Sequence, residues 1–249
     1  KVTFGTGANM AVGDTITLGN VINDVHGNPI SGSVAITGSF AINSLLGTIA
    51  YWKFDEGLSD SVGDSVGSYS GTRYNGLGSW ITGKFGSALD FTGTIGYVSL
   101  TNAVQLSSYN EWTIEAWFYA PLAPNLDNYN TLIIDTTTQH IMVSNTRYLG
   151  TYSTADGGGF RSSGYSGMDT LATGWHHLVA VGKNSKTYFY IDGSPVGTYS
   201  NYQPSASISK RGNGRNASSE FKRPWGKIDD MVIYKRSLTQ AEISTRAAR

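Results

Sequence analysis

Short runs of β-branched and aromatic residues recur along the whole chain, and Gly, Asn, Asp or Ser bounds each of them. Such runs are typical of β-strands, and the bounding residues are those that tolerate turns. Because no helical pattern alternates with the runs, a parallel sheet with crossover helices is excluded and an antiparallel sandwich or barrel is expected. The predicted strands are Thr15–Leu18, Ser33–Ala41, Ile49–Phe54, Ala88–Phe91, Gly96–Leu100, Trp112–Ala120, Thr131–Asp135, Trp175–Val181, Thr187–Ile191 and Ile228–Tyr234.

Two local signals are more specific than the strand pattern. The pair Asp192-Gly193 follows the run Thr187–Ile191 and predicts a tight hairpin turn, since both residues tolerate a positive φ. Near the C-terminus, Thr239 and Glu242 have the spacing of a capping box, which opens a helix by pairing its free first-turn amides. The sequence therefore predicts one short helix, Thr239–Ala248.

Charge and composition exclude several classes of protein. The 249 residues include 18 basic and 18 acidic side chains and no cysteine. Zero net charge argues against nucleic-acid binding by bulk electrostatics, and the missing thiols exclude disulfides and thiolate zinc sites. No apolar run approaches the ~20 residues of a membrane span. Only 14% of the residues are charged, with many Tyr, Thr, Ser and Gly, so an extracellular or cell-surface location is expected.

The composition changes near Asn43–Leu46 and suggests two parts, residues 1–46 and 47–249. The first part contains at most three strands, and its segment Asp24–Gly32 is similar to the last hairpin of prokaryotic Ig-like modules. An Ig sandwich needs about seven strands, so this β-rich arm is too short to close a core. Two interpretations stay open: a domain has been cut, or the arm adds strands to a neighbouring subunit.

Residues 47–249 resemble the laminin-G-like jelly roll of the concanavalin A-like lectin/glucanase superfamily. The resemblance implies an all-β fold: a two-sheet antiparallel jelly-roll sandwich that carries the N-terminal arm and a C-terminal helical turn. No single segment is specific, but the segments occur in the family's order. They include Ala50–Gly57, Trp80–Leu89, Trp112–Pro121, Gly174–Ala180, Tyr190–Gly197, Lys227–Arg236 and Leu238–Ile243.

Several predicted strands have a second face that combines aromatic and polar side chains. In Trp112–Ala120, alternate residues from Trp112 to Phe118 are apolar and belong in the core, which leaves the others on the opposite face. Flat rings beside polar groups suit a sugar-binding surface. The alternative is that a loop or the arm covers the rings. The candidate ligand-binding residues are Trp117, Tyr119, Tyr188, Tyr190 and Tyr234.

The resemblance also implies a structural Ca²⁺ between the first and last strands. The matching acids are Asp55, Glu56, Asp229 and Asp230, and carboxylate oxygens are ligands that calcium prefers. The alternative for the Asp55-Glu56 pair is an ordinary solvated or capping role. A separate triplet, Asn216-Ala217-Ser218, has the pattern of an N-glycosylation site.

The sequence lacks the features of an enzyme. The acidic Glu-x-Asp-x-x-Glu strand of the superfamily's glucanases is absent, and so are a nucleophile elbow and a phosphate-binding loop. The adjacent His176 and His177 point to opposite faces of a strand and cannot form one site.

We therefore expect a non-catalytic extracellular surface or adhesion protein that binds glycan or protein ligands. One alternative is a structural subunit of a filament or surface array, a homo-oligomer assembled through residues 1–46 by strand donation. A remote alternative is a glycan-active enzyme.

Overall fold

The computed structural model divides into two units, Lys1–Leu46 and Gly47–Arg249. In the first unit, β1 (Thr15–Leu18) pairs antiparallel with β2 (Gly32–Ala35). The Ig-like segment Asp24–Gly32, apart from its last residue, lies outside the described residues. The structure describes residues 15–18, 32–35, 46–74, 77–94, 96–122, 129–134, 138–153, 158–196, 201–204, 207–211, 222–223 and 225–249.

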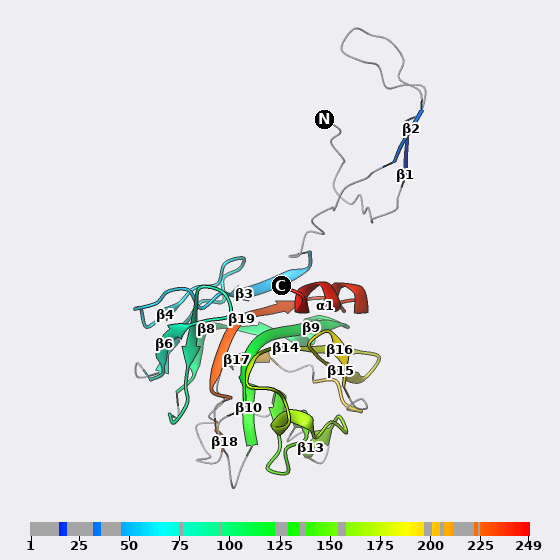
Figure 1. Ribbon diagram of the computed structural model, residues 1–249. Coiled ribbons are helices and arrows are strands. Elements are labelled where there is room, and N and C mark those ends of the chain that lie inside the picture. Colours follow the sequence, from blue (N-terminus) through cyan, green and yellow to red (C-terminus); the bar gives the residue numbers. More distant parts are fainter. Residues whose placement is uncertain are drawn as a thin grey trace. The chain divides into compact units, whose positions relative to one another are not determined.

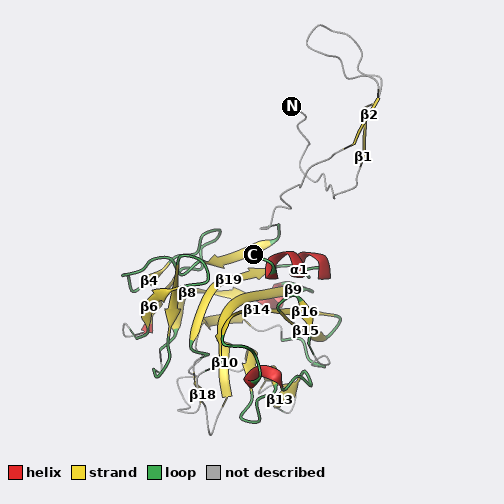
Figure 2. Ribbon diagram, in the orientation of Figure 1, coloured by secondary structure: helices red, strands yellow, loops and turns green. Residues whose placement is uncertain are grey.

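The second unit contains two sheets in its described residues (Figures 1 and 2). The eight-stranded sheet has the order β16-β15-β14-β9-β19-β7-β6, with β3 also paired to β19. Its strands are β3 (Thr48–Trp52), β6 (Ser79–Thr82), β7 (Ser87–Asp90), β9 (Trp112–Ala120), β14 (Gly174–Lys183), β15 (Lys186–Ile191), β16 (Ser194–Pro195) and β19 (Lys227–Tyr234).

The nine-stranded sheet has the order β13-β12-β11-β10-β17-β8-β5-β4, with β18 also paired to β10. Its strands are β4 (Ser61–Val62), β5 (Gly71–Arg73), β8 (Val98–Gln105), β10 (Tyr129–Ile134), β11 (Thr138–Val143), β12 (Leu149–Ser153), β13 (Gly159–Ser162), β17 (Ser207–Arg211) and β18 (Lys222–Arg223). Apart from the β10–β18 pair, the described ladders are antiparallel. The predicted all-β, two-sheet jelly roll is confirmed.

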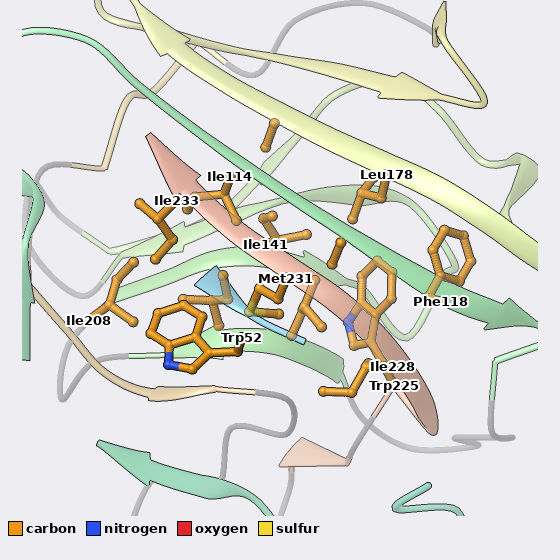
Figure 3. Close-up of a cluster of buried hydrophobic side chains, with 14 of the residues drawn as sticks. Trp52, Ile114, Phe118, Ile141, Leu178, Ile208, Trp225, Ile228, Met231 and Ile233 are labelled. Carbon is orange, nitrogen blue, oxygen red and sulfur yellow. The ribbon is translucent and has the colours of Figure 1, made fainter. Parts of the chain in front are cut away.

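The core lies between the two sheets and follows from the period-two alternation of the strands. The four apolar residues from Trp112 to Phe118 predicted to face inward belong to this core, as do Phe189 and Ile191. Figure 3 shows side chains from both sheets meeting there. Those labelled are Trp52, Ile114, Phe118, Leu178, Ile228, Met231 and Ile233 from the eight-stranded sheet, Ile141 and Ile208 from the nine-stranded sheet, and Trp225.

The face of one residue in β19 departs from strict alternation. Strict alternation places Asp229 on the core face with Met231 and Ile233, but a register shift occurs between Asp229 and Val232 against β9. Asp230 has a φ of 45° at this shift. The irregularity turns Asp229 to the opposite face, where it is the cross-strand partner of Trp117.

The C-terminal helix α1 (Gln240–Ala247) begins as predicted. The Thr239 hydroxyl accepts from the Glu242 amide, and the Glu242 carboxylate accepts from the Thr239 amide at 2.8 Å, so the capping box is confirmed. The predicted Asp192-Gly193 turn is also present between β15 and β16, with φ angles of 49° and 78°. Short 3-10 turns occur at Leu106–Ser108 and Gly167–Asp169.

The Gly-, Tyr- and Ser-rich segment Tyr148–Tyr165 contains the strands β12 and β13. Because of its many Gly and Ser residues, the sequence of this segment lacks the runs of β-branched and aromatic residues that predict strands. Gly150 is required by packing, since a Cβ there would come within 2.8 Å of the Phe160 ring on the neighbouring strand. The strands are therefore defined by cross-strand pairing rather than by local propensity.

Candidate functional site

The candidate site is the outer face of the eight-stranded sheet, which points away from the nine-stranded sheet. Strand register places side chains on this face in rows that run across the strands. One row lies at the ends of β14, β9, β19, β7 and β6, and we call it the open row. Its members are Trp175, Tyr119, Lys227, Asp90 and Ser79. The register pairs Trp175 with Tyr119, Lys227 with Asp90, and Asp90 with Ser79, and Lys227 Nζ lies over the Tyr119 ring.

The open row is accessible to solvent. Trp175, Tyr119, Lys227 and Asp90 are half-buried, and Ser79 is exposed. The rings of Trp175 and Tyr119 meet edge to face with centroids 5.6 Å apart, and Lys227 Nζ lies 4.6 Å from the Tyr119 ring centroid. The row therefore combines two aromatic rings with a cation, a carboxylate and a hydroxyl. This combination suits a ligand with both apolar faces and hydroxyl groups.

The next row of the outer face is closed. Trp117 is only 4% exposed, because the turn between β6 and β7 packs over its indole. The Phe85 ring meets it edge to face at 5.7 Å, and Lys84 Nζ lies 4.4 Å from its centroid. On its other side, His177 is buried and its ring centroid is 5.1 Å away. Trp117 thus offers no free ring face to a sugar.

A buried polar network lies further along the outer face, beneath α1. The Tyr234 hydroxyl donates to Glu115 Oε1 at 2.6 Å and accepts from Arg246 Nε at 3.2 Å. Glu115 Oε2 lies 3.3 Å from Arg246 Nε and 3.4 Å from His177 Nε2, distances typical of ion pairs, although neither contact has hydrogen-bond geometry. Tyr234 is 1% exposed, so it serves packing and pairing rather than ligand contact.

Burial and charge together decide the protonation of this network. Burial and the neighbouring Glu115 carboxylate raise the pKa of the Tyr234 hydroxyl, so it stays a donor. Burial alone would lower the pKa of Arg246, but Glu115 and Tyr234 outweigh it and hold that pKa above its usual value. The helix therefore brings a charged guanidinium to a buried carboxylate.

The remaining aromatic candidates, Tyr188 and Tyr190, lie outside the open row. Both are half-buried and pack against a second apolar cluster. This cluster contains Ile243 of α1 and Leu238 just before it. The sequence anticipated a loop or the arm as a cover, whereas in the described residues the cover is α1 (Figure 1) and the turn at 84–85. Of the five predicted ligand-binding residues, Tyr119 alone belongs to the open row.

The four acids expected to bind calcium each accept a hydrogen bond from the protein. Asp55 Oδ1 accepts from the Ser87 amide at 2.9 Å, and Glu56 Oε1 accepts from the Gly63 amide at 2.7 Å. Asp229 accepts from the amides of Phe85 and Asp230, at 2.9 and 2.8 Å.

Asp230 completes the set. Its Oδ1 accepts from the Tyr51 hydroxyl at 2.7 Å, and its Oδ2 lies 3.5 Å from Arg249 Nη2. Burial raises the pKa of Asp229 to about 7 and also raises that of Asp230. Both carboxyl groups are therefore in surroundings that disfavour their charged forms.

Within the described part of the chain, no group of three acidic or histidine side chains could hold a metal ion. Asp55 and Glu56 accept from backbone amides, and Asp229 and Asp230 lie at the irregularity in β19. Calcium binding stays a prediction from the resemblance. The predicted glycosylation site, Asn216, lies outside the described residues.

Sequence reasoning missed four of the five residues in the open row: Trp175, Lys227, Asp90 and Ser79. Trp175, Lys227 and Asp90 lie in or beside predicted strands, but nothing local shows which strands are neighbours. The sequence did place Trp117 and Tyr119 together on the outer face of their strand. Given the β9–β14 register, Trp175 falls opposite Tyr119 on the same face.

Comparison with known sequences and structures agrees with this architecture. The family model Laminin_G_3, described as the concanavalin A-like lectin/glucanases superfamily, matches residues 92–244. The chain belongs to this superfamily. No curated protein matches its sequence at a significant level.

Several solved structures of other proteins share the fold of this chain. Domain 4 of an extracellular arabinanase from Geobacillus stearothermophilus, solved with arabinotriose, is 21% identical with a TM-score of 0.56, and the match covers 80% of this chain and 98% of that one. A Trypanosoma rangeli sialidase is 15% identical with a TM-score of 0.56, over 81% of this chain and 32% of that one. The receptor-binding domain of botulinum neurotoxin D is 15% identical with a TM-score of 0.54, over 84% of this chain and 53% of that one.

These likenesses show the fold alone. The chain spans about a third of the length of the sialidases that it matches. Among the helices that the structure describes, none has the length and apolarity to cross a membrane.

Proposed function

We propose that this protein is a non-catalytic glycan-binding module that holds a polysaccharide chain along the open row. The observation that carries the proposal is the row itself, in which Trp175 and Tyr119 adjoin Lys227, Asp90 and Ser79 across five neighbouring strands. With neighbouring strands about 4.8 Å apart, the row extends over about 19 Å. An extended chain of several sugar units fits such a length better than a single small molecule does.

The superfamily and two of its structural neighbours support a glycan as the ligand. The arabinanase domain was solved with an arabinotriose, and the sialidases with sialic acid derivatives. The toxin domain is named for receptor binding, which keeps a protein ligand as the competing outcome. The open row favours the glycan because its two rings are the flat apolar surfaces on which sugars stack.

The placement of the carboxylates supports binding without catalysis. Most glycosidases need two carboxyl groups that flank the scissile bond. In the described part of the open row, Asp90 is the one carboxylate. Glu115 and Asp229 also lie on the outer face, but they are 3% and 0% exposed, beneath α1 and beside the turn at 84–85. A substrate cannot reach either group while these elements stay docked.

A binding assay with single-residue variants tests the proposal. On a glycan array, and then by affinity electrophoresis in the polysaccharides that it identifies, Trp175→Ala and Tyr119→Ala should each weaken binding about three- to tenfold, the value of one ring contact. Tyr188→Ala is the matched control, because this tyrosine lies on the same face but packs near α1. Equal weakening by all three variants, or an empty array, would refute the proposal.

A surface or adhesion role fits the low charge and the Gly- and Tyr-rich composition. Strand donation by residues 1–46 is the second candidate function. It is favoured by the β1–β2 pair, because the described residues of the arm form a two-stranded sheet and an isolated two-stranded hairpin is at best marginally stable in water. Deleting residues 1–46 should then convert an assembled particle into a monomer, as measured by light scattering. Assemblies that persist without the arm would exclude donation.

A further inference from the structure

A pocket of about 380 Å³ lies at the edge of the eight-stranded sheet. It is lined by Gly57, Trp80, Ile81, Thr82, Gly86 and Ser87. In the described residues β6 is the last strand on this side of the sheet, so the pocket borders an unpaired strand edge. The pocket contains no member of the open row.

The backbone of β6 presents polar groups to this edge. The Gly83 amide donates to the Gly86 carbonyl at 2.9 Å and closes the β6–β7 turn. Hydrogen-bonded pairs alternate along an antiparallel ladder, so Ile81 pairs with Ala88 and Ser79 with Asp90 through backbone hydrogen bonds. The peptide groups of Trp80 and Thr82 therefore point away from β7, toward the edge. They supply donors and acceptors at fixed positions.

The Trp80 indole is held in place by its neighbours. Its Nε1 donates to the Ser59 carbonyl at 3.0 Å, and the guanidinium carbon of Arg73 lies 5.5 Å from its ring centroid. Arg73 in turn pairs with Asp60 at 2.6 Å and donates to the Gly78 carbonyl at 2.7 Å. The ring is thus pre-organised, and the nearby positive charge already has an acidic partner.

The lining selects for a small, neutral, hydroxylated ligand. All six lining residues are uncharged, and two of them, Thr82 and Ser87, carry hydroxyl groups. Gly86 has a φ of 53°, and a Cβ there would come within 2.1 Å of Asp55 Oδ1. A side chain is therefore excluded at this position, because the Asp55 carboxylate already lies where it would go. An indole beside hydroxyls and free peptide groups suits a sugar ring.

We propose that this pocket binds one neutral sugar unit, either free or at the end of a chain. It is a second site, which does not depend on the open row. An extended peptide that added to β6 would be the competing occupant. The sugar is favoured because β6 has only four residues, and edge strands this short offer little pairing to a further strand.

Fluorine NMR on fluorotryptophan-labelled protein tests the pocket directly. The Trp80 resonance is assigned with Trp80→Phe, and free glucose, galactose, mannose and arabinose are titrated one at a time. At least one sugar should shift the Trp80 resonance saturably. Thr82→Val should weaken that binding about three- to tenfold, the value of one hydrogen bond, and Thr82→Arg should abolish it by filling the pocket. Thr82 is exposed, so neither variant threatens the fold, and Thr101→Val, at an exposed threonine of the other sheet, is the matched control.

Three results would overturn the proposal. They are a Trp80 resonance that no sugar of the panel shifts, a shift that survives Thr82→Arg unchanged, and a shift produced by an extended peptide but by no sugar. The Trp175→Ala variant separates the two sites. It should lose polysaccharide affinity and keep the monosaccharide shift at Trp80, so failure at one site leaves the other testable.

Discussion

The ion pair beneath α1 makes a quantitative prediction about stability. Arg246 is 5% exposed, and its guanidinium is the cation that α1 brings to the buried Glu115 carboxylate. Removing one partner of a buried pair leaves an uncompensated charge and costs about 3–5 kcal/mol. We therefore expect Arg246→Ala to lower the free energy of unfolding by about 4 kcal/mol. With an m value of about 3 kcal/mol/M, the urea midpoint should fall by about 1.3 M.

Arg249 offers a matched control three residues further along. Its side chain is 47% exposed, and it lies 3.5 Å from Asp230, which the Tyr51 hydroxyl also contacts. Exposed pairs of this kind contribute about 0–1 kcal/mol, so Arg249→Ala should shift the urea midpoint by a third of a molar or less.

A double-mutant cycle isolates the pair itself. Glu115→Gln keeps an acceptor for the Tyr234 hydroxyl but removes the charge, so Arg246→Met should cost less in that background, with a coupling of about 2 kcal/mol. The assay is urea unfolding followed by tryptophan fluorescence, with circular dichroism as a second probe of two-state behaviour. Equal costs for Arg246→Ala and Arg249→Ala, or a coupling near zero, would refute the reasoning.

Three further predictions concern stability. In chelator, the free energy of unfolding should fall as pH rises from about 4 to about 7. Burial raises the pKa of Asp229 from 3.8 to about 7 in the folded state, so over this range the folded protein holds a proton that the unfolded chain has released. Asp229→Asn should flatten this slope in thermal melts; a slope that calcium abolishes would support the calcium site, and an identical melt with and without chelator would reject it. Gly182→Ala should cost about 1–3 kcal/mol by overpacking, since its Cβ would come within 2.2 Å of the Trp112 indole, and an unchanged melting temperature would contradict this packing. Thr239→Ala should cost about 1 kcal/mol through loss of the α1 cap, measured by urea unfolding against Thr245→Ala inside the helix; equal costs would show that the cap contributes nothing.

The sequence predicted local structure correctly where the residues of a single element decide its conformation. The β9 strand follows from alternation, and the Asp192-Gly193 turn follows from the tolerance of both residues for a positive φ. The Thr239 cap follows from a side chain within hydrogen-bond reach of the first turn of its own helix. These signals are local, and the structure has them at the predicted positions.

The short strands were missed for the opposite reason. Strands such as β4, β5 and β13 have two to four residues, too few for a period to be visible, and they are formed by pairing with longer neighbours. The bulge at Asp230 likewise has no local signal, yet it reverses the face of Asp229.

The sequence alone indicated which residue types form the candidate site, but it did not indicate which of them a ligand can reach. Alternation places Trp117, Tyr119 and Tyr234 opposite the core-facing residues of their own strands, because the side-chain period of a strand is a local property. Which of them meets solvent depends on where α1 and the turn at 84–85 dock, and docking is decided by long-range packing. Only the tertiary structure therefore closes the face over Trp117 and Tyr234, leaves Tyr119 beside Trp175, and opens a pocket at Trp80.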